Sequence, residues 1–285
     1  MKRLPKPEND AGDTYAACIS RVRDRELKSK LENLRDDIEE SAANYDVKAQ
    51  SNQLHEIAGT GDYGGVSGSE IQKVYKDRMA KSGTPGRPIY DQLMIVPQRR
   101  CPLCSHRDVS TLDHYLPESE FSLLVVTPFN LVPSCKDCNF NKKTFVPSSS
   151  ENHTFHPYYD DFDDAVWLVA HIVQSDPLGV QFQPVKPLAW DDSKFNRARH
   201  HFEKMKLHAL YSDNAVSELI EVRAILCELF SLGGCETLTE EMAAREASIR
   251  RARPNSWRAA LFAAAAADVW FCEGGFKNIE DILRL

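Results

Sequence analysis

The sequence lacks an apolar run long enough to cross a bilayer. The longest such stretch, residues 259–271, is interrupted by Asp268 and falls short of the roughly 20 residues that a membrane-spanning helix requires. The first residues are polar and include Pro5 and Pro7, without the apolar core of a secretory signal. We therefore expect a cytoplasmic protein that does not span a membrane.

Positive charge is also in short supply. The formal net charge is −7, which argues against a general electrostatic grip on nucleic acid, because phosphate contacts need positive charge along the binding face. Any basic surface must therefore be local. Two stretches, residues 194–206 and 245–258, are rich in lysine, arginine or histidine. The ordinary interpretation of both is a solvated helix face.

A phosphate-binding loop is missing as well. Residues 59–68 contain five glycines, but no lysine follows them at the position that a P-loop requires. This segment is expected to be a flexible loop or hinge. The chain therefore has no nucleotide-binding motif of this kind.

The pattern of apolar residues predicts an α+β protein that is predominantly helical, with a small module at its centre. Residues 14–57 suggest one long or two shorter amphipathic helices, and residues 69–80 a short helix. Short extended segments are expected at residues 109–114 and 129–132, followed by a short helix at 135–145. A buried strand is expected at 165–173, paired with residues 181–183. Further helices are expected at 192–211, 213–232, 237–252 and 255–271.

Three regions follow from this pattern. Residues 1–82 form an N-terminal helical region, residues 83–160 a compact module interrupted by prolines, and residues 161–285 a mainly helical C-terminal region.

Eight cysteines in a reducing compartment are unsuited to a disulfide framework, so their spacing is better interpreted as metal binding or catalysis. Four of them form two Cys-x-x-Cys pairs, which are Cys101 with Cys104 and Cys135 with Cys138. Four thiolates match a tetrahedral zinc ion, and such a closed shell leaves no position for a reactive water. We therefore expect a structural zinc ion. The single residues Cys18, Cys227, Cys235 and Cys272 are expected to be small buried side chains.

Other polar residues lie between and beside these cysteines. They are Asp113 and His114 in Thr-Leu-Asp-His-Tyr-Leu-Pro, Asn130 in Phe-Asn-Leu-Val-Pro-Ser-Cys, and Asn139 and Lys142 in Cys-Asn-Phe-Asn-Lys. The order of these motifs resembles the HNH endonuclease family in its zinc-knuckle form, over about forty-five residues of the 285. The resemblance implies a ββα-metal module that hydrolyses phosphodiester bonds.

The resemblance assigns roles to these residues. His114, whose ring can accept a proton near pH 7, is the expected general base that activates water. Asp113 points the opposite way along an extended strand, toward a divalent cation. Asn130 is the central asparagine, which ties down the loop and helps to orient the base. Lys142 is expected to contact a phosphate as a point charge, and Arg99, Arg100 and Lys143 either extend that contact or are ordinary surface charges.

Asn139 departs from the family pattern, because the residue after the last cysteine is often histidine there. An amide oxygen is a hard ligand, so Asp113 with Asn139 favours Mg²⁺ or Mn²⁺ over zinc as the catalytic ion. Asn141 is a rival ligand. His156 is expected to pack beside the site, near Asp160 and Asp161, without an assigned chemical role.

The expected activity is metal-dependent endonucleolytic cleavage of DNA. The family resemblance also extends to effectors of anti-phage defence that pair an HNH nuclease with an ATPase. Two alternatives remain open. One is a non-catalytic zinc module that binds nucleic acid or protein, and the other is an RNase, since water activation at a phosphodiester does not itself choose DNA over RNA.

Overall fold

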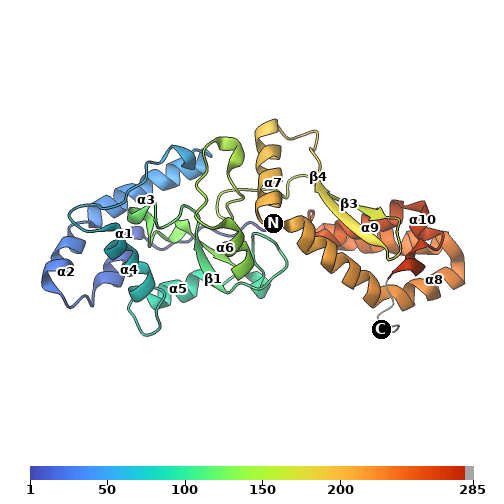
Figure 1. The fold of residues 1–285 in the computed structure, drawn as a ribbon, viewed down its shortest axis with the longest axis horizontal. Coiled ribbons are helices and arrows are strands. Elements are labelled where there is room, and N and C mark those ends of the chain that lie inside the picture. Colours follow the sequence, from blue (N-terminus) through green and yellow to red (C-terminus); the bar gives the residue numbers. More distant parts are fainter. Residues whose placement is uncertain (280–285) are drawn as a thin grey trace. The chain divides into compact units, whose positions relative to one another are not determined.

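The structure is a computed structural model, and it describes residues 1–279. Contacts divide the chain into two compact units, which we call the N-terminal unit (Lys2–Asp161) and the C-terminal unit (from Phe162 onward). Helices predominate, and the two small sheets are antiparallel (Figure 1). The α+β class expected from the sequence is confirmed. Within residues 1–279, no helix is both long enough and apolar enough to cross a membrane.

The N-terminal unit contains six α-helices and one hairpin among the described residues. The helices are α1 (Ala11–Ile19), α2 (Arg25–Glu32), α3 (Arg35–Gln50), α4 (Gly68–Arg78), α5 (Arg87–Leu93) and α6 (Lys136–Lys142). The strands are β1 (Thr111–His114) and β2 (Leu131–Ser134). Single 3₁₀ turns lie at Leu54–Glu56, Pro97–Arg99, Ser122–Leu124, Pro128–Asn130 and Ser150–Asn152.

The first fifty residues form three helices, where the sequence suggested one or two. The chain breaks after α1, and Asp24 then caps α2 by accepting a hydrogen bond from the backbone N–H of Leu27. Aspartate is among the best N-cap residues, because its carboxylate satisfies an N–H that has no partner inside the helix. Helix α5, with a proline in its first turn, was not predicted at all.

A single hydrophobic core joins the N-terminal helices to the hairpin. Tyr15, Ile38 and Ile71 from α1, α3 and α4 lie in the same buried cluster as Leu112 of β1 and Leu131 of β2. Burial of this apolar surface is the main source of stability. The helices of residues 1–82 therefore support the hairpin from the same core.

The C-terminal unit consists of a hairpin with four α-helices among its described residues. Its elements are β3 (Leu168–Val173), β4 (Gly179–Pro184), α7 (Asp192–Lys204), α8 (Leu207–Ala252), α9 (Trp257–Ala267) and α10 (Val269–Cys272), with a 3₁₀ turn at Gly275–Asn278. Helix α8 begins after Lys206, which has a left-handed conformation, and it is interrupted at Gly234 by a non-helical backbone conformation (φ 67°, ψ −151°), so its two parts correspond to the helices expected at 213–232 and 237–252.

The strand expected at residues 165–173 is β3, and it pairs with β4 as predicted. It is not fully buried, however. Leu168 and Ala170 are buried whereas His171 is exposed, so one face of the hairpin packs on the helices and the other meets solvent. The buried side chain of Asn255 fixes the start of β3 by accepting hydrogen bonds from the backbone N–H groups of Trp167 and Leu168.

Candidate metal centre and adjoining histidine site

The four paired cysteines converge on one buried point. Cys101 and Cys104 precede β1, Cys135 caps α6, and Cys138 lies in the first turn of that helix. All four Sγ atoms lie within 4.8 Å of one another, and those of Cys104 and Cys135 are 4.0 Å apart. Four sulfurs held about 2.3 Å from a tetrahedral zinc ion stand about 3.8 Å apart. The donor set and its spacing therefore fit a structural metal ion such as zinc.

The four thiols compete with one another for protons. Hydrogen bonds within the cluster lower the pKa of Cys104 and of Cys135, whereas burial raises the pKa of Cys101 and hydrogen bonds with the other thiols raise that of Cys138. Thiolates are the form that binds zinc. The other cysteines differ from this set. Cys18 and Cys272 are buried as expected, but Cys227 is exposed and Cys235 half-buried, so the expectation of burial is wrong for those two.

Strand β1, which follows the first cysteine pair in the sequence, carries the two motif residues Asp113 and His114. In the antiparallel register Asp113 faces Val132 and His114 faces Leu131. Helix α6 follows β2 directly and packs against β1. The module thus has the order strand, strand, helix.

His114 is buried, and its ring is held in one orientation. Its Nε2 lies 2.7 Å from the backbone carbonyl oxygen of Val125. A carbonyl can only accept, so Nε2 carries the proton, and in the neutral ring Nδ1 has the free lone pair. The ring also meets Tyr75 of α4 edge to face, with centroids 4.5 Å apart. Burial lowers the pKa of His114, so the neutral form prevails at pH 7.

Asp113 and Lys142 form a buried ion pair. The Lys142 Nζ lies 3.2 Å from Oδ1 of Asp113 and donates a 2.7 Å hydrogen bond to the backbone carbonyl of His114. Lys142 is only 2% exposed and Asp113 only 5%. Burial raises the pKa of Asp113 to about 6, although Lys142 opposes this shift. The expectation that Lys142 offers its charge to a phosphate therefore does not describe this structure, because the charge is directed inward.

Both polar atoms of the Asn130 side chain form hydrogen bonds to the backbone of one loop. Its Oδ1 accepts from the backbone N–H of Leu116 at 2.8 Å, and its Nδ2 donates to the carbonyls of Leu116 and Leu124. Leu124 immediately precedes Val125, whose carbonyl orients His114. The side chain of Asn130 thus fixes the loop that positions the histidine.

The remaining predicted residues lie on α6 or at the surface. Asn139 and Asn141 are half-buried on α6, and the carbonyl of Asn139 accepts the backbone hydrogen bond of Lys143. Lys143 is exposed, as are Arg99 and Arg100, and Arg100 pairs with Asp108. Of the predicted residues, the structure brings Asp113, His114 and Lys142 into direct contact, through the side chain of Lys142.

His156 lies in a cluster of aromatic rings. Its Nε2 is 2.8 Å from the hydroxyl of Tyr45, and its ring centroid is 4.3 Å from that of Tyr115, the residue after His114. Asp160 accepts a hydrogen bond from the backbone N–H of His156.

The sequence did not predict two neighbours of His114, the ring of Tyr75 and the carbonyl of Val125, because nothing in the local pattern of either segment indicates contact with His114.

The basic stretches of the C-terminal unit are largely paired with acids or buried. Lys194 pairs with Asp164, Arg258 with Glu218 and Arg245 with Glu241. His201 is fully buried. These stretches therefore offer less free positive charge than their composition suggested.

Comparison with known proteins gives one informative relative. No protein-family model matches the chain, and no solved structure matches it. The chain is 26% identical over 233 residues to protein ea31 of Escherichia phage lambda. The match covers 78% of this chain and 79% of that protein. Over most of its length, the chain is thus similar to a phage protein.

Proposed function

We propose that the chain is a metal-dependent endonuclease of the HNH type that hydrolyses phosphodiester bonds in DNA. The observation that carries this proposal is the state of His114. Its imidazole is buried and neutral, its Nε2 proton is committed to the Val125 carbonyl, and no described residue is hydrogen-bonded to Nδ1. A fixed neutral imidazole with a free lone pair is what a general base requires.

In the proposed reaction, His114 accepts the proton of the attacking water at Nδ1. The positive charge that then forms on the ring is stabilised by the Val125 carbonyl, and the negative charge of Glu118 also favours it. Asn130 keeps the ring in position through the loop of residues 116–125. The Cys₄ centre fixes the start of α6 relative to the segment before β1.

Asp113 and Asn139 are the proposed ligands of a Mg²⁺ or Mn²⁺ ion. Carboxylate and amide oxygens suit these ions, and the ion would take the place of the Lys142 ammonium as the counter-charge of Asp113. When bound, such an ion neutralises charge on the scissile phosphate and assists the leaving oxygen.

The test is cleavage of supercoiled plasmid by the purified chain, with Mg²⁺, with Mn²⁺ and without added metal. We expect nicking by the wild type, and at least about a hundredfold less by His114→Ala, the scale of a lost general base. His171→Ala, which removes an exposed histidine of the C-terminal unit, is the matched control and should cut normally. A structured RNA is incubated in parallel, because RNA is the alternative substrate.

The non-catalytic alternative predicts a different result. If His114→Ala cuts as well as the wild type, the proposed active site is wrong. If the folded, zinc-loaded wild type cuts neither plasmid nor RNA, a zinc module that binds nucleic acid or protein is favoured instead. The family resemblance also suggested anti-phage defence beside a partner ATPase. The similarity to a phage lambda protein supports a role in phage biology, but it does not favour a role in anti-phage defence.

A further inference from the structure

Helix α6 presents a large aromatic side chain to solvent. Phe140 is 71% exposed, although it lies in the middle of α6, directly after the proposed metal ligand Asn139. A phenyl ring in water gives up the free energy that its burial would contribute. Single exposed apolar residues are nevertheless common on protein surfaces. The significance of Phe140 therefore depends on its neighbours.

The exposed neighbours of Phe140 are lysines. Lys136 lies one helical turn earlier on the same side of α6, and Lys143 follows at the end of the helix. The Nζ of Lys143 lies 5.6 Å from the centroid of the Phe140 ring, which is a cation–π contact. No described acidic side chain forms an ion pair with either lysine, and the acid of α6, Asp137, is neutralised by Arg107 at 2.8 Å. We call Lys136, Phe140 and Lys143 the α6 face.

The buried ion pair of the module holds the end of the α6 face. The Nζ of Lys142, which pairs with Asp113, also lies 3.4 Å from the carbonyl oxygen of Lys143. The backbone N–H of Lys143 donates to the carbonyl of Asn139. Lys143 has φ 53° and ψ −141°, a conformation that glycine adopts more readily than lysine does. The module thus fixes the backbone from which the Lys143 side chain starts.

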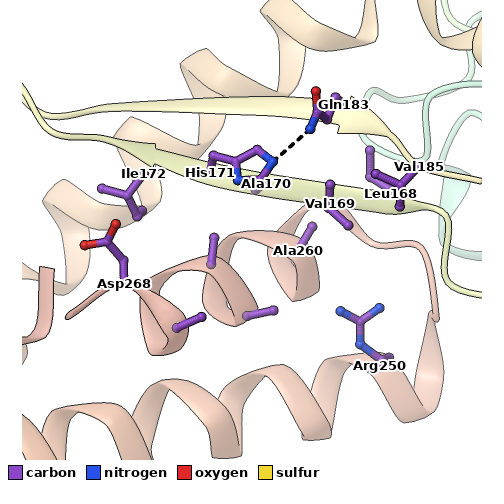
Figure 2. Close-up of a pocket in the computed structure, with 13 residues that line it drawn as sticks. Leu168, Val169, Ala170, His171, Ile172, Gln183, Val185, Arg250, Ala260 and Asp268 are labelled. Carbon is purple, nitrogen blue, oxygen red and sulfur yellow. Dashed lines mark hydrogen bonds between the residues drawn. The ribbon is translucent and has the colours of Figure 1, made fainter. Parts of the chain in front are cut away.

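The basic stretch at residues 245–258 offers less free charge than the α6 face. Its Arg250 lines a groove of about 520 Å³ between β3 and α9 (Figure 2). The guanidinium of Arg250 is paired with Glu246 and donates a 2.7 Å hydrogen bond to the carbonyl of Pro254. This arginine is therefore already engaged within the chain, whereas the two lysines of the α6 face keep unpaired charges.

A phenyl ring flanked by ammonium groups matches the chemistry of single-stranded nucleic acid. An unpaired base has an open aromatic face that can stack on the ring, and the phosphates on either side of it attract the ammonium groups. A duplex also offers phosphates, but its base faces are covered by the neighbouring bases until a base leaves the stack. A small basic surface is also consistent with the formal net charge of −7, because few phosphates need to be held.

We propose that the α6 face binds an unpaired base of the DNA substrate, with the base stacked on Phe140 and the adjacent phosphates contacted by Lys136 and Lys143. This inference rests on the proposed nuclease function and specifies its substrate class, which is DNA that is single-stranded or locally unpaired. Phe140 then determines specificity and takes no part in the chemical step. A negatively supercoiled plasmid remains a substrate, because supercoiling favours local unpairing.

The first experiment measures binding of the full chain to a short labelled single strand and to the matched duplex by fluorescence anisotropy. No Mg²⁺ or Mn²⁺ is added, so that the DNA stays intact. We expect tighter binding of the single strand by the wild type. Phe140→Ala should weaken single-strand binding by at least about fivefold, and duplex binding much less. Val47→Ala removes another exposed apolar side chain, from α3, and is the matched control that should bind like the wild type.

A spectroscopic variant detects the stacking directly. Phe140→Trp keeps an aromatic face, so it should retain single-strand binding, and its added emission should be quenched by the single strand. The four native tryptophans all lie beyond residue 161, and the wild type supplies their background signal. Emission that responds to protein concentration and not to DNA would identify a protein interface instead and overturn the proposal.

The lysines are tested by the salt dependence of binding. Lys143→Gln should lower the slope of the logarithm of the single-strand binding constant against that of salt concentration by about 0.7. Lys73→Gln is the matched control, because Lys73 pairs with Glu70 on α4. Equal affinity of the wild type for single strand and duplex, or unchanged single-strand binding by Phe140→Ala, overturns the proposal.

Binding and cleavage fail separately in this design. A chain that binds single strands through Phe140 but cuts neither DNA nor RNA contradicts only the proposed nuclease function. A chain whose plasmid nicking depends on His114, but whose single-strand binding is the same in Phe140→Ala, contradicts only the role of the α6 face.

Discussion

The ammonium of Lys142 lies 3.2 Å from the carboxylate of Asp113, and both side chains are almost completely buried. The pair joins the end of α6 to β1, and Lys142 also bonds to the carbonyl of His114. A buried charge is tolerated only when it is paired and hydrogen-bonded. The contact between α6 and β1 is therefore centred on an ion pair. Removing either partner would leave the other as an unpaired buried charge, which lowers the stability of the fold.

Lys142→Met is expected to destabilise the protein by roughly 3–5 kcal/mol at pH 7, because the carboxylate of Asp113 is left buried without a partner. The loss should be smaller at pH 5. The pKa of Asp113 is about 6 with Lys142 present and rises further without it, so the carboxyl is protonated there. The measurement is urea unfolding at both pH values. The double variant Asp113→Asn with Lys142→Met should recover part of the loss, and no recovery would contradict a direct coupling.

Substitution of Asn130 should mainly lower the stability of the protein, whereas substitution of Asn139 should mainly lower its cleavage activity. Asn130→Ala removes the three hydrogen bonds that the Asn130 side chain makes to the backbone of Leu116 and Leu124, and the unfolding free energy should fall by about 1–3 kcal/mol as buried groups lose their partners. Asn139→Ala, in a half-buried helical position, should change stability little but abolish Mg²⁺-dependent nicking if Asn139 is a ligand. Unfolding curves and plasmid cleavage for both variants check this. Equal stability of the two variants would be inconsistent with the role of Asn130.

The buried histidine should make stability fall in mild acid. The pKa of His114 is lowered in the folded state, so the unfolded chain binds a proton more readily. Its contribution is complete above its unfolded pKa of about 6.5 and is lost as pH falls through its lower folded value. The wild type should therefore lose more stability between pH 7.5 and pH 5.5 than His114→Gln does. The zinc site titrates equally in both proteins, so it cancels in the difference. Parallel pH profiles would show that His114 is not held neutral.

The metal centre should be required for folding of the N-terminal unit. Cys138→Ser removes one of the four sulfurs that lie within 4.8 Å of one another, and the purified variant should lose its zinc and unfold at a markedly lower temperature. Cys227→Ser alters an exposed thiol and is the matched control. Metal content by atomic emission and thermal unfolding by circular dichroism provide the measurement. A Cys138→Ser protein with full zinc and unchanged melting would exclude this centre.

Local sequence signals predicted the parts of the fold that depend on interactions between residues close together in the sequence. The two Cys-x-x-Cys pairs indicated the metal centre, because each pair fits one knuckle and four sulfurs satisfy one ion. The apolar run at 165–173 predicted a strand that pairs with residues 181–183 of β4, and separate helices were predicted at 213–232 and 237–252, on either side of the kink at Gly234. The breaks between α1, α2 and α3 were less clear, since a capping aspartate such as Asp24 is one of many acidic residues in that segment.

The sequence by itself determined which residues could bind a metal ion or transfer a proton, because cysteine, histidine, aspartate and asparagine each offer a fixed set of donor atoms. Only the tertiary structure decided how they are used. Burial lowers the pKa of His114 and raises that of Asp113, and a carbonyl eleven residues away in the chain sets the ring orientation of His114. The same burial turns Lys142 inward. Desolvation and orientation depend on long-range packing, which no local pattern of residues specifies.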